Sequence, residues 1–142
     1  KKLLLIHGPN LNLLGARSAQ HYGSLTLAQL EIFVVGRAEK LGVKIICSQS
    51  NHEGDLIDFI QKFSRRAAGI IINPGALAHY SYALHDALLD SGLPCVEVHL
   101  SAVKRREAWR RKSVTAPASL AEISGQGERG YETALKLLIA KI

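Results

Sequence analysis

Short apolar runs that alternate with helical segments are the feature that most constrains how this chain can fold. Four such runs, at residues 3–6, 43–48, 69–72 and 95–100, are too short for helices. Strands that are apolar throughout are typical of a parallel sheet with helices on both faces. With a fifth, shorter strand at 120–124, we expect an α/β fold, namely a flavodoxin-like, doubly wound five-stranded parallel sheet in a single domain over residues 1–142.

The segments between the runs carry apolar residues at helical spacing. They predict helices over 26–41, from about 53 to 63, over 80–91 and over 128–142, with a short helix over 106–110. Ser24 is a candidate N-cap of the first helix, and Gly42 is its expected end. A chain of 142 residues can bury a core of its own without help from disulfides or metals.

Polar side chains collect just after the predicted strand ends. The first run breaks at His7-Gly8-Pro9-Asn10, and the stretch from there to Gly23 carries polar residues with no helical or strand period. Open parallel sheets bind ligands at the carboxyl ends of their strands, so we expect a site there, with an ordinary surface loop as the alternative. The polar residues in question are Asn10, Asn12, Arg17 and Tyr22, then Gln49 to Glu53, then Asn73, Gly75, His79 and Ser101.

Glu97 and His99 interrupt the fourth apolar run. Side chains alternate along a strand, so these two lie on one face, and Val96, Val98 and Leu100 lie on the other. A histidine beside a carboxylate at a strand end fits a general acid that the carboxylate orients. A buried structural pair is the alternative interpretation.

A basic run from residue 104 to 112 contributes six of the positive charges behind the net charge of +6. It could be a solvated surface, a footprint for nucleic acid, or part of an anion site. On a short helix Arg106 and Arg110 would share a face, which could cap the site and fix an anion or a polyol. The other four residues of the run, Lys104, Arg105, Arg111 and Lys112, are then expected to face solvent.

Several other patterns are interpreted as structural. The GxGxxG at Gly125–Gly130 lies near the end of the chain rather than in the first strand–helix turn, so we expect a tight turn and not a dinucleotide site. The six histidines lack metal-site spacing, so no metal is predicted. Cys47 and Cys95 lie in predicted buried strands and are expected to pack in the core of a cytoplasmic protein. No targeting segment or membrane span is predicted.

Several segments together resemble one family, the type II 3-dehydroquinate dehydratases, over essentially the whole chain. They are GPNLNLLG at 8–15 with Arg17 and Tyr22-Gly23, QSNHEG at 49–54, INPGA at 72–76 with His79, EVHLS at 97–101, and the pair Arg106 and Arg110. The resemblance implies dehydration of 3-dehydroquinate to 3-dehydroshikimate through an enolate, without a cofactor, in the shikimate pathway. It also implies a homododecamer built as a tetramer of trimers, with neither nucleic acid nor membrane as a partner.

The resemblance also assigns catalytic roles. Tyr22, used as a tyrosinate, is the base, and Arg17 makes it easier to deprotonate. Asn10 holds a water that stabilises the enolate. His99 is the acid for the leaving hydroxyl, and Glu97 orients it. Arg17 and Tyr22 are expected to move together on a lid loop at about 15–23.

The same resemblance assigns the substrate contacts. The substrate carboxylate is expected at Asn73, Leu100 and Ser101, and the substrate hydroxyls at His79 and Arg110. Arg106 is expected on a closing loop, and Asp86 is expected to reach the site of a neighbouring subunit. The chain departs from the family pattern outside these positions, at Ser18-Ala19, Leu77-Ala78 and Ala102. Two other functions stay open at this point, a basic nucleic-acid-binding module and a flavin or nucleotide carrier.

Overall fold

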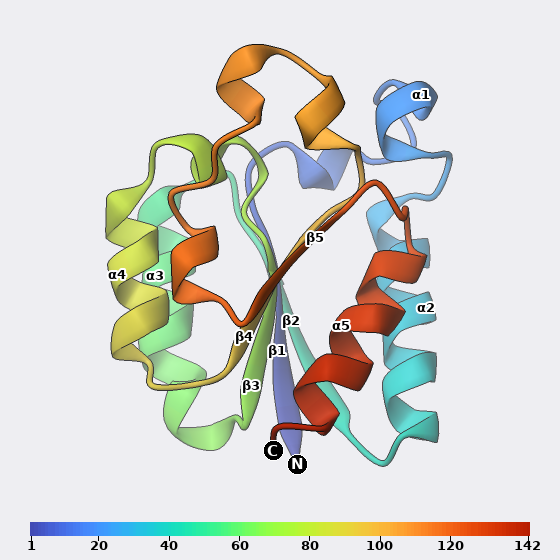
Figure 1. Ribbon diagram of the computed structural model, residues 1–142. Coiled ribbons are helices and arrows are strands. Elements are labelled where there is room, and N and C mark those ends of the chain that lie inside the picture. The colour runs from blue at the N-terminus through green and yellow to red at the C-terminus, as the bar shows by residue number, and fades with distance from the viewer.

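A computed structural model describes residues 1–142, and it has five parallel strands in one sheet (Figure 1). Their order across the sheet is β2-β1-β3-β4-β5. This confirms the expected flavodoxin-like, doubly wound architecture. The strands are β1 (Lys2–His7), β2 (Lys44–Gln49), β3 (Gly69–Asn73), β4 (Cys95–His99) and β5 (Ala121–Ser124).

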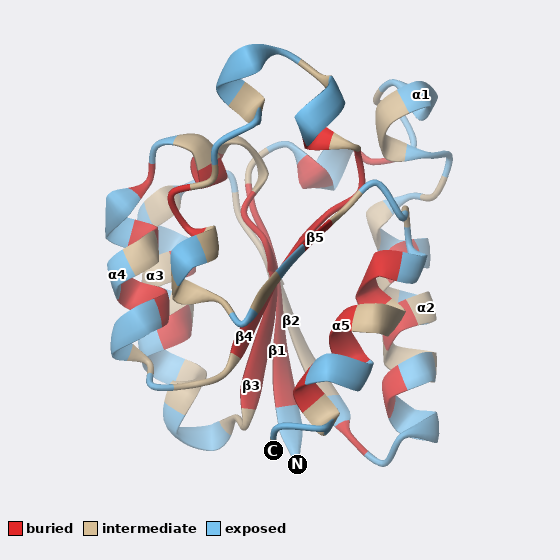
Figure 2. Ribbon diagram, viewed as in Figure 1, coloured by how far each residue is buried: buried red, intermediate tan, exposed pale blue.

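Two pairs of helices cover the sheet. One face is covered by α2 (Leu27–Lys40) and α5 (Arg129–Ile139), and the other by α3 (Glu53–Phe63) and α4 (Tyr82–Asp90), so there are two apolar cores (Figure 1). Figure 2 shows the buried residues along the central strands and on the helix sides that face them. No helix is both long enough and apolar enough to cross a lipid bilayer.

The first long helix begins two residues later than its expected cap. Thr26, rather than Ser24, is the N-cap of α2, since its hydroxyl accepts from the backbone N–H of Gln29 and the Gln29 side chain accepts from the Thr26 N–H. This reciprocal pair is a capping box, which satisfies two otherwise unpaired donors. Gly42 ends the helix as expected, with a φ of 77° that glycine adopts without strain.

The predicted helix over 106–110 is wrong. The segment forms two separate 3₁₀ turns, Val103–Arg105 and Ala108–Arg110, and Arg106 between them is extended, with φ −102° and ψ −159°. The helical argument that placed Arg106 and Arg110 on one face therefore does not hold. The extended backbone at Arg106 instead accompanies a side chain that reaches inward to Tyr22 and Ser101.

The two cysteines differ in burial. Cys95 is buried, whereas Cys47 is only half-buried, because β2 is an edge strand and its outer side has no neighbouring strand. Burial raises the pKa of both thiols to about 12, with the Glu31 carboxylate adding to the effect at Cys47. Both cysteines are therefore uncharged at neutral pH. The glycines from Gly125 to Gly130 form the turn from β5 to α5, as expected.

The ends of β1 and β3 lie in direct backbone contact. The Gly8 N–H donates to the Asn73 carbonyl oxygen at 2.8 Å, and a Cβ on Gly8 would lie 2.3 Å from the Pro74 carbonyl oxygen. Gly75, with φ 60°, approaches the Pro9 carbonyl oxygen in the same way. The loops that follow β1 and β3 can therefore approach this closely only because Gly8 and Gly75 carry no Cβ.

We predict that Gly8→Ala lowers the free energy of unfolding by about 1–3 kcal/mol, because the new Cβ would overlap backbone atoms that cannot rotate away. Gly36→Ala is the matched control, since nothing lies within 4 Å of a Cβ there, and alanine in a helix should be neutral or stabilising. Denaturant unfolding of both variants measures the difference. Equal stability of the two variants would contradict the close contact.

Candidate functional site

A cavity lies above the carboxyl ends of β1, β3 and β4. The connecting loops gather at this end of the sheet (Figure 1). Most of the residues selected from the sequence line the cavity. They are Asn10, Arg17, Tyr22, Asn73, His79, His99, Leu100, Ser101, Arg106 and Arg110. Side chains that are far apart in the sequence therefore meet at one edge of the sheet, as the parallel arrangement requires.

Asn10 has an unusual backbone. Its φ of 70° makes it the only residue other than glycine with a positive φ, and its N–H donates to Asn51 Oδ1 at 2.9 Å. Gln49 holds the same oxygen at 3.1 Å. A left-handed asparagine costs free energy unless its surroundings fix it, and such residues gather at functional sites.

Asn73, in the adjacent strand, has a fixed amide. It is almost fully buried, and its Oδ1 accepts from the Gly75 N–H at 3.1 Å. On the other side its Nδ2 lies 3.5 Å from the hydroxyl of Tyr131, a fully buried residue of α5 whose pKa is raised by burial. The amide is therefore oriented before any ligand arrives.

Tyr22 lies between two guanidinium groups. The Arg17 Cζ is 3.7 Å from the centroid of the Tyr22 ring, and Arg106 Nη1 donates to the Tyr22 hydroxyl at 2.7 Å. The resemblance assigned Arg17 alone to the activation of Tyr22. The structure places Arg17 over the ring face and Arg106 at the oxygen, because α1 (Ala19–Tyr22) turns the ring toward the 103–110 segment.

Glu97 and His99 form the pair that the alternation predicted. His99 Nε2 lies 2.9 Å from Glu97 Oε2, and both residues are buried. Only His99 lines the cavity, while Glu97 lies behind it. Glu97 therefore contacts the histidine and no part of the open space, as an orienting group would.

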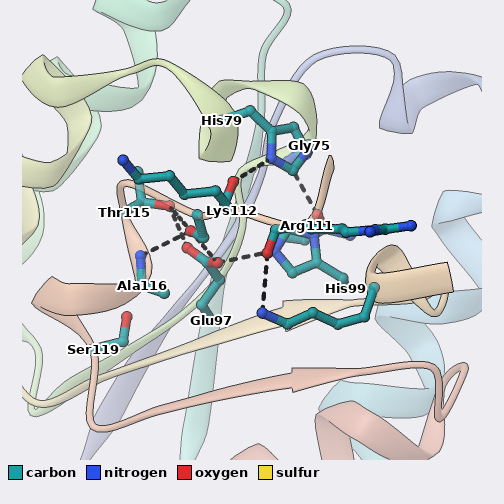
Figure 3. A network of polar contacts seen from close by, with 12 residues as sticks. Gly75, His79, Glu97, His99, Arg111, Lys112, Thr115, Ala116 and Ser119 are labelled. Atoms are coloured by element: carbon teal, nitrogen blue, oxygen red, sulfur yellow. Dashed lines mark hydrogen bonds and ion pairs between the residues drawn. The ribbon is translucent and has the colours of Figure 1, made fainter. Parts of the chain in front are cut away.

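A stack of aromatic rings continues from this pair. The His79 ring lies 6.4 Å from the His99 ring at an interplanar angle of 20°, and Trp109 meets His79 edge-on at 5.2 Å. His79 Nδ1 is 2.7 Å from the Lys112 carbonyl oxygen, so that nitrogen carries the proton (Figure 3). The Arg110 Cζ lies 4.0 Å from the Trp109 ring centroid. The 103–112 segment thus forms one wall of the cavity.

Charge is distributed unevenly around the cavity. Its lining contains Arg17, Arg106 and Arg110 and no aspartate or glutamate. Arg106 and Arg110 are largely covered, with exposed side-chain fractions of 10% and 18%. Lys104, Arg105, Arg111 and Lys112 face solvent, as expected. The cavity is therefore suited to an anion.

Some residues selected from the sequence do not line this cavity, namely Asn12, the stretch from Gln49 to Glu53, and Asp86. Asp86 is the one among them that the resemblance assigned to a site. It lies on α4 with its side chain 73% exposed, and its only close partner is His85, whose Nδ1 is 3.1 Å from Asp86 Oδ1. The resemblance assigned Asp86 to the site of a neighbouring subunit, so a position outside this cavity agrees with that assignment without testing it.

Metal-ligand residue types meet at one place that the sequence did not indicate. Glu97, His99 and Glu122 offer atoms within 4.8 Å of one another, because Glu97 pairs with Glu122 in the β4–β5 register. The Glu97 carboxylate, however, already accepts hydrogen bonds from His99, Ser113 and Thr115. The absence of a metal site stays a prediction.

Sequence reasoning missed Trp109, Ser113 and Thr115. Trp109 is a single aromatic residue within the basic run, and nothing in the local sequence links Ser113 or Thr115 to β4. A serine and a threonine in an irregular segment are ordinary turn residues. Only the path of the loop over the edge of the sheet brings them to Glu97.

Comparison with known proteins agrees with the fold. A family model described as dehydroquinase class II matches residues 1–139. The 3-dehydroquinate dehydratase of Roseiflexus castenholzii is 52% identical over 138 residues, covering 97% of this chain and 88% of the relative. That of Bacillus cereus is 49% identical over 142 residues, covering 100% of this chain and 97% of the relative. The crystal structure of the type II dehydroquinase from Butyrivibrio crossotus superposes with a TM-score of 0.94 at 43% identity, covering 96% of each chain.

The fold and the site therefore define a class of small α/β lyase, and the chain belongs to the class II dehydroquinase family. The reaction of this family is the dehydration of 3-dehydroquinate, a step of the shikimate pathway, and this chain is an enzyme of that type.

Proposed function

We propose that this chain dehydrates 3-dehydroquinate to 3-dehydroshikimate with Tyr22 as the base and His99 as the acid. The observation that carries the proposal is the arrangement of two guanidiniums around one phenol, with Arg106 Nη1 2.7 Å from the Tyr22 oxygen. His99, with Glu97 behind it, lines the same cavity. A base and an acid that face one space fit an elimination in which a proton and a hydroxyl leave one molecule.

The base step depends on charge. A free tyrosine is protonated at neutral pH and is a poor base, whereas its anion is a good one. A unit positive charge at about 4 Å stabilises an anion by ~4 kcal/mol at an effective dielectric near 20, which changes an equilibrium about a thousandfold. Arg106 supplies such a charge at the oxygen and Arg17 adds one at the ring face. Tyr22 then takes the proton beside the ketone and leaves an enolate.

The second step breaks the carbon–oxygen bond. The electron pair of the enolate forms the new carbon–carbon double bond while His99 gives a proton to the departing hydroxyl, which leaves as water. The proton taken by Tyr22 returns to His99 through solvent, so protons balance over the cycle. Asn10 is assigned to the water that stabilises the enolate, because it lies in the cavity wall with its backbone fixed.

The substrate anion is assigned to the strand ends that border the cavity and to the wall formed by the segment 103–112. Asn73, with the backbone at Leu100 and Ser101, meets the carboxylate, and His79 and Arg110 meet the hydroxyls. Support comes from the fixed amide of Asn73 and from a lining with three arginines and no carboxylate. The segment 15–23 is the lid that brings Arg17 and Tyr22 over the substrate. Ala19 is the first residue of α1, a position that proline favours, so alanine there leaves the lid without the stiffening that a proline would give.

The assembly is proposed to be a homododecamer, a tetramer of trimers, in the cytoplasm. Exposed apolar side chains gather on and beside α4, at Tyr80, Tyr82 and Leu89, next to Asp86. Such a surface is typical of an interface, and it would let Asp86 enter a neighbouring site. Two free cysteines fit a reducing compartment.

Tyr22→Phe tests the base. The variant keeps the ring between the arginines and removes the oxygen, so kcat for dehydration of 3-dehydroquinate should fall about 10²–10⁴-fold. Formation of the conjugated enone, followed in the ultraviolet, measures the rate. Thr133→Val, which also removes one hydroxyl but on α5 and outside the cavity, is the control and should keep wild-type kinetics. Substantial turnover by Tyr22→Phe would reject the assigned role.

Arg106→Gln tests which guanidinium serves the phenol oxygen. Loss of a charged hydrogen bond at 2.7 Å should lower kcat about 10–100-fold. Arg105→Gln, at an exposed neighbour of the same charge, should change little. Arg17→Gln removes the cation from the ring face and is expected to lower kcat as well. If Arg106→Gln behaves like Arg105→Gln while Arg17→Gln is inactive, Arg17 alone activates the base.

Mixed oligomers test the shared site. Tyr22→Phe and Asp86→Ala chains should each be poorly active alone, and chains unfolded together and refolded should regain part of the wild-type rate, since some sites then combine intact groups from two subunits. Analytical ultracentrifugation of the wild type should give the mass of a dodecamer. A fully active monomer would contradict the proposed assembly.

A further inference from the structure

Glu97 is a completely buried carboxylate that contacts no lysine or arginine. Its exposed fraction is 0%, and its ion-pair partner is His99. A carboxylate removed from water is costly unless each oxygen meets donors. Its Oε2 meets His99 Nε2 at 2.9 Å and Ser113 Oγ at 2.7 Å, and its Oε1 meets Thr115 Oγ1 (Figure 3). The hydroxyl groups of Ser113 and Thr115 therefore supply the remaining hydrogen bonds to the Glu97 carboxylate.

The direction of these bonds follows from counting protons. A hydroxyl carries one proton, and Ser113 Oγ already accepts from the Ala116 N–H at 2.9 Å, so its proton is free for Glu97. Thr115 Oγ1 contacts Glu97 Oε1 and also lies 3.2 Å from Ser113 Oγ, but a hydrogen bond to a carboxylate is stronger than one between two hydroxyls, so its proton also goes to Glu97. With a donor on each of its oxygens, Glu97 is an acceptor throughout and is held as the ionised carboxylate.

An ionised Glu97 determines which nitrogen of His99 carries a proton. A carboxylate cannot donate, so Nε2 must carry the proton that joins it to Glu97. The other nitrogen, Nδ1, makes no hydrogen bond within the protein and belongs to a ring that lines the cavity. In the imidazolium form, Nδ1 is then the nitrogen that gives its proton to the leaving hydroxyl.

We propose that Ser113 and Thr115 are positioning residues for the dehydration step, which hold Glu97 ionised and thereby fix the tautomer and the orientation of His99. The inference rests on the assignment of His99 as the acid. Both hydroxyls lie on the segment that follows Arg106 and Arg110, and this segment is fastened to the wall around His79 by the Val114 N–H, which donates to the Ala78 carbonyl oxygen at 2.6 Å. The acid is thus oriented by the same stretch of chain that supplies the basic wall.

Thr115→Val tests this directly, because valine matches the shape of threonine without the hydroxyl. We expect kcat for dehydration to fall about 10–100-fold with KM little changed, while exchange of the substrate's α-proton in deuterated water persists. Thr115→Ser restores the hydroxyl and should recover most of the rate. Ser113→Ala, at a less buried position, should likewise lower the rate of dehydration while exchange of the α-proton persists.

Two controls separate positioning from packing. Thr133→Val, at a half-buried position of α5 outside the cavity, should behave as wild type. In a His99→Ala background, Thr115→Val should cost nothing further, because a residue that acts through His99 loses its effect when His99 is absent. Equal losses in both backgrounds, wild-type kcat in Thr115→Val, or equal losses in Thr115→Val and Thr115→Ser would overturn the proposal.

An NMR measurement, which does not depend on enzyme activity, tests the role of Ser113 and Thr115 separately from the proposed function. Nitrogen-15 NMR of the imidazoles, with His99 assigned by its absence in His99→Ala, should show the neutral ring protonated at Nε2 in the wild type. Thr115→Val combined with Ser113→Ala should populate the other tautomer. A wild-type ring protonated at Nδ1 would overturn the inference, whereas a wild-type enzyme that leaves 3-dehydroquinate unchanged would refute the function instead.

Discussion

The register of the central parallel strands is the constraint on which the rest of this structure depends. His7 of β1 pairs with Asn73 of β3, and Ile72 of β3 pairs with Glu97 of β4, so the three strands end at nearly the same level. A slip of one residue in β4 would turn Glu97 and His99 into the opposite core and bring Val98 to their place. The continuous apolar packing on both faces of the sheet opposes such a slip. Hydrophobic burial therefore fixes the positions of polar groups that do not themselves stabilise the fold.

The charged groups at the carboxyl ends of the strands differ in how deeply they are buried. Three arginines border the open cavity, while the Glu97 carboxylate is hidden behind His99 and the largely exposed Glu107, which pairs with Arg106 and Arg110, does not line it. This arrangement lets an anion approach without repulsion and still provides the histidine with an acceptor. It also places the strongest donors at the phenol, where negative charge would develop. The site is organised by the placement of charge.

The segment from residue 103 to 115 connects these parts. Arg106 reaches the Tyr22 hydroxyl, Trp109 packs on His79, and Thr115 reaches Glu97. A segment without long helices or strands can follow the edge of a sheet closely and present successive side chains to different partners. The polar and aromatic contacts that hold it are the ones that local sequence patterns describe least well.

Much of the fold could be predicted, because hydrophobic periodicity is a local property of the chain. The strands, the strand–helix alternation and the common face of Glu97 and His99 all follow from it. The errors arose where tertiary contacts override local preference. Arg106 is extended instead of helical because its side chain bonds across the cavity, and Cys47 is half-buried because the strand order leaves β2 at the edge.

The sequence by itself determined the fold class and the candidate residues at each strand end, since both depend on spacing and side-chain type along the chain. The tertiary structure alone decided that Arg106 rather than Arg17 contacts the Tyr22 oxygen, and that Ser113 and Thr115 meet Glu97. Those pairings join residues from different loops. Their geometry depends on the packing of several elements at once, which no local pattern records.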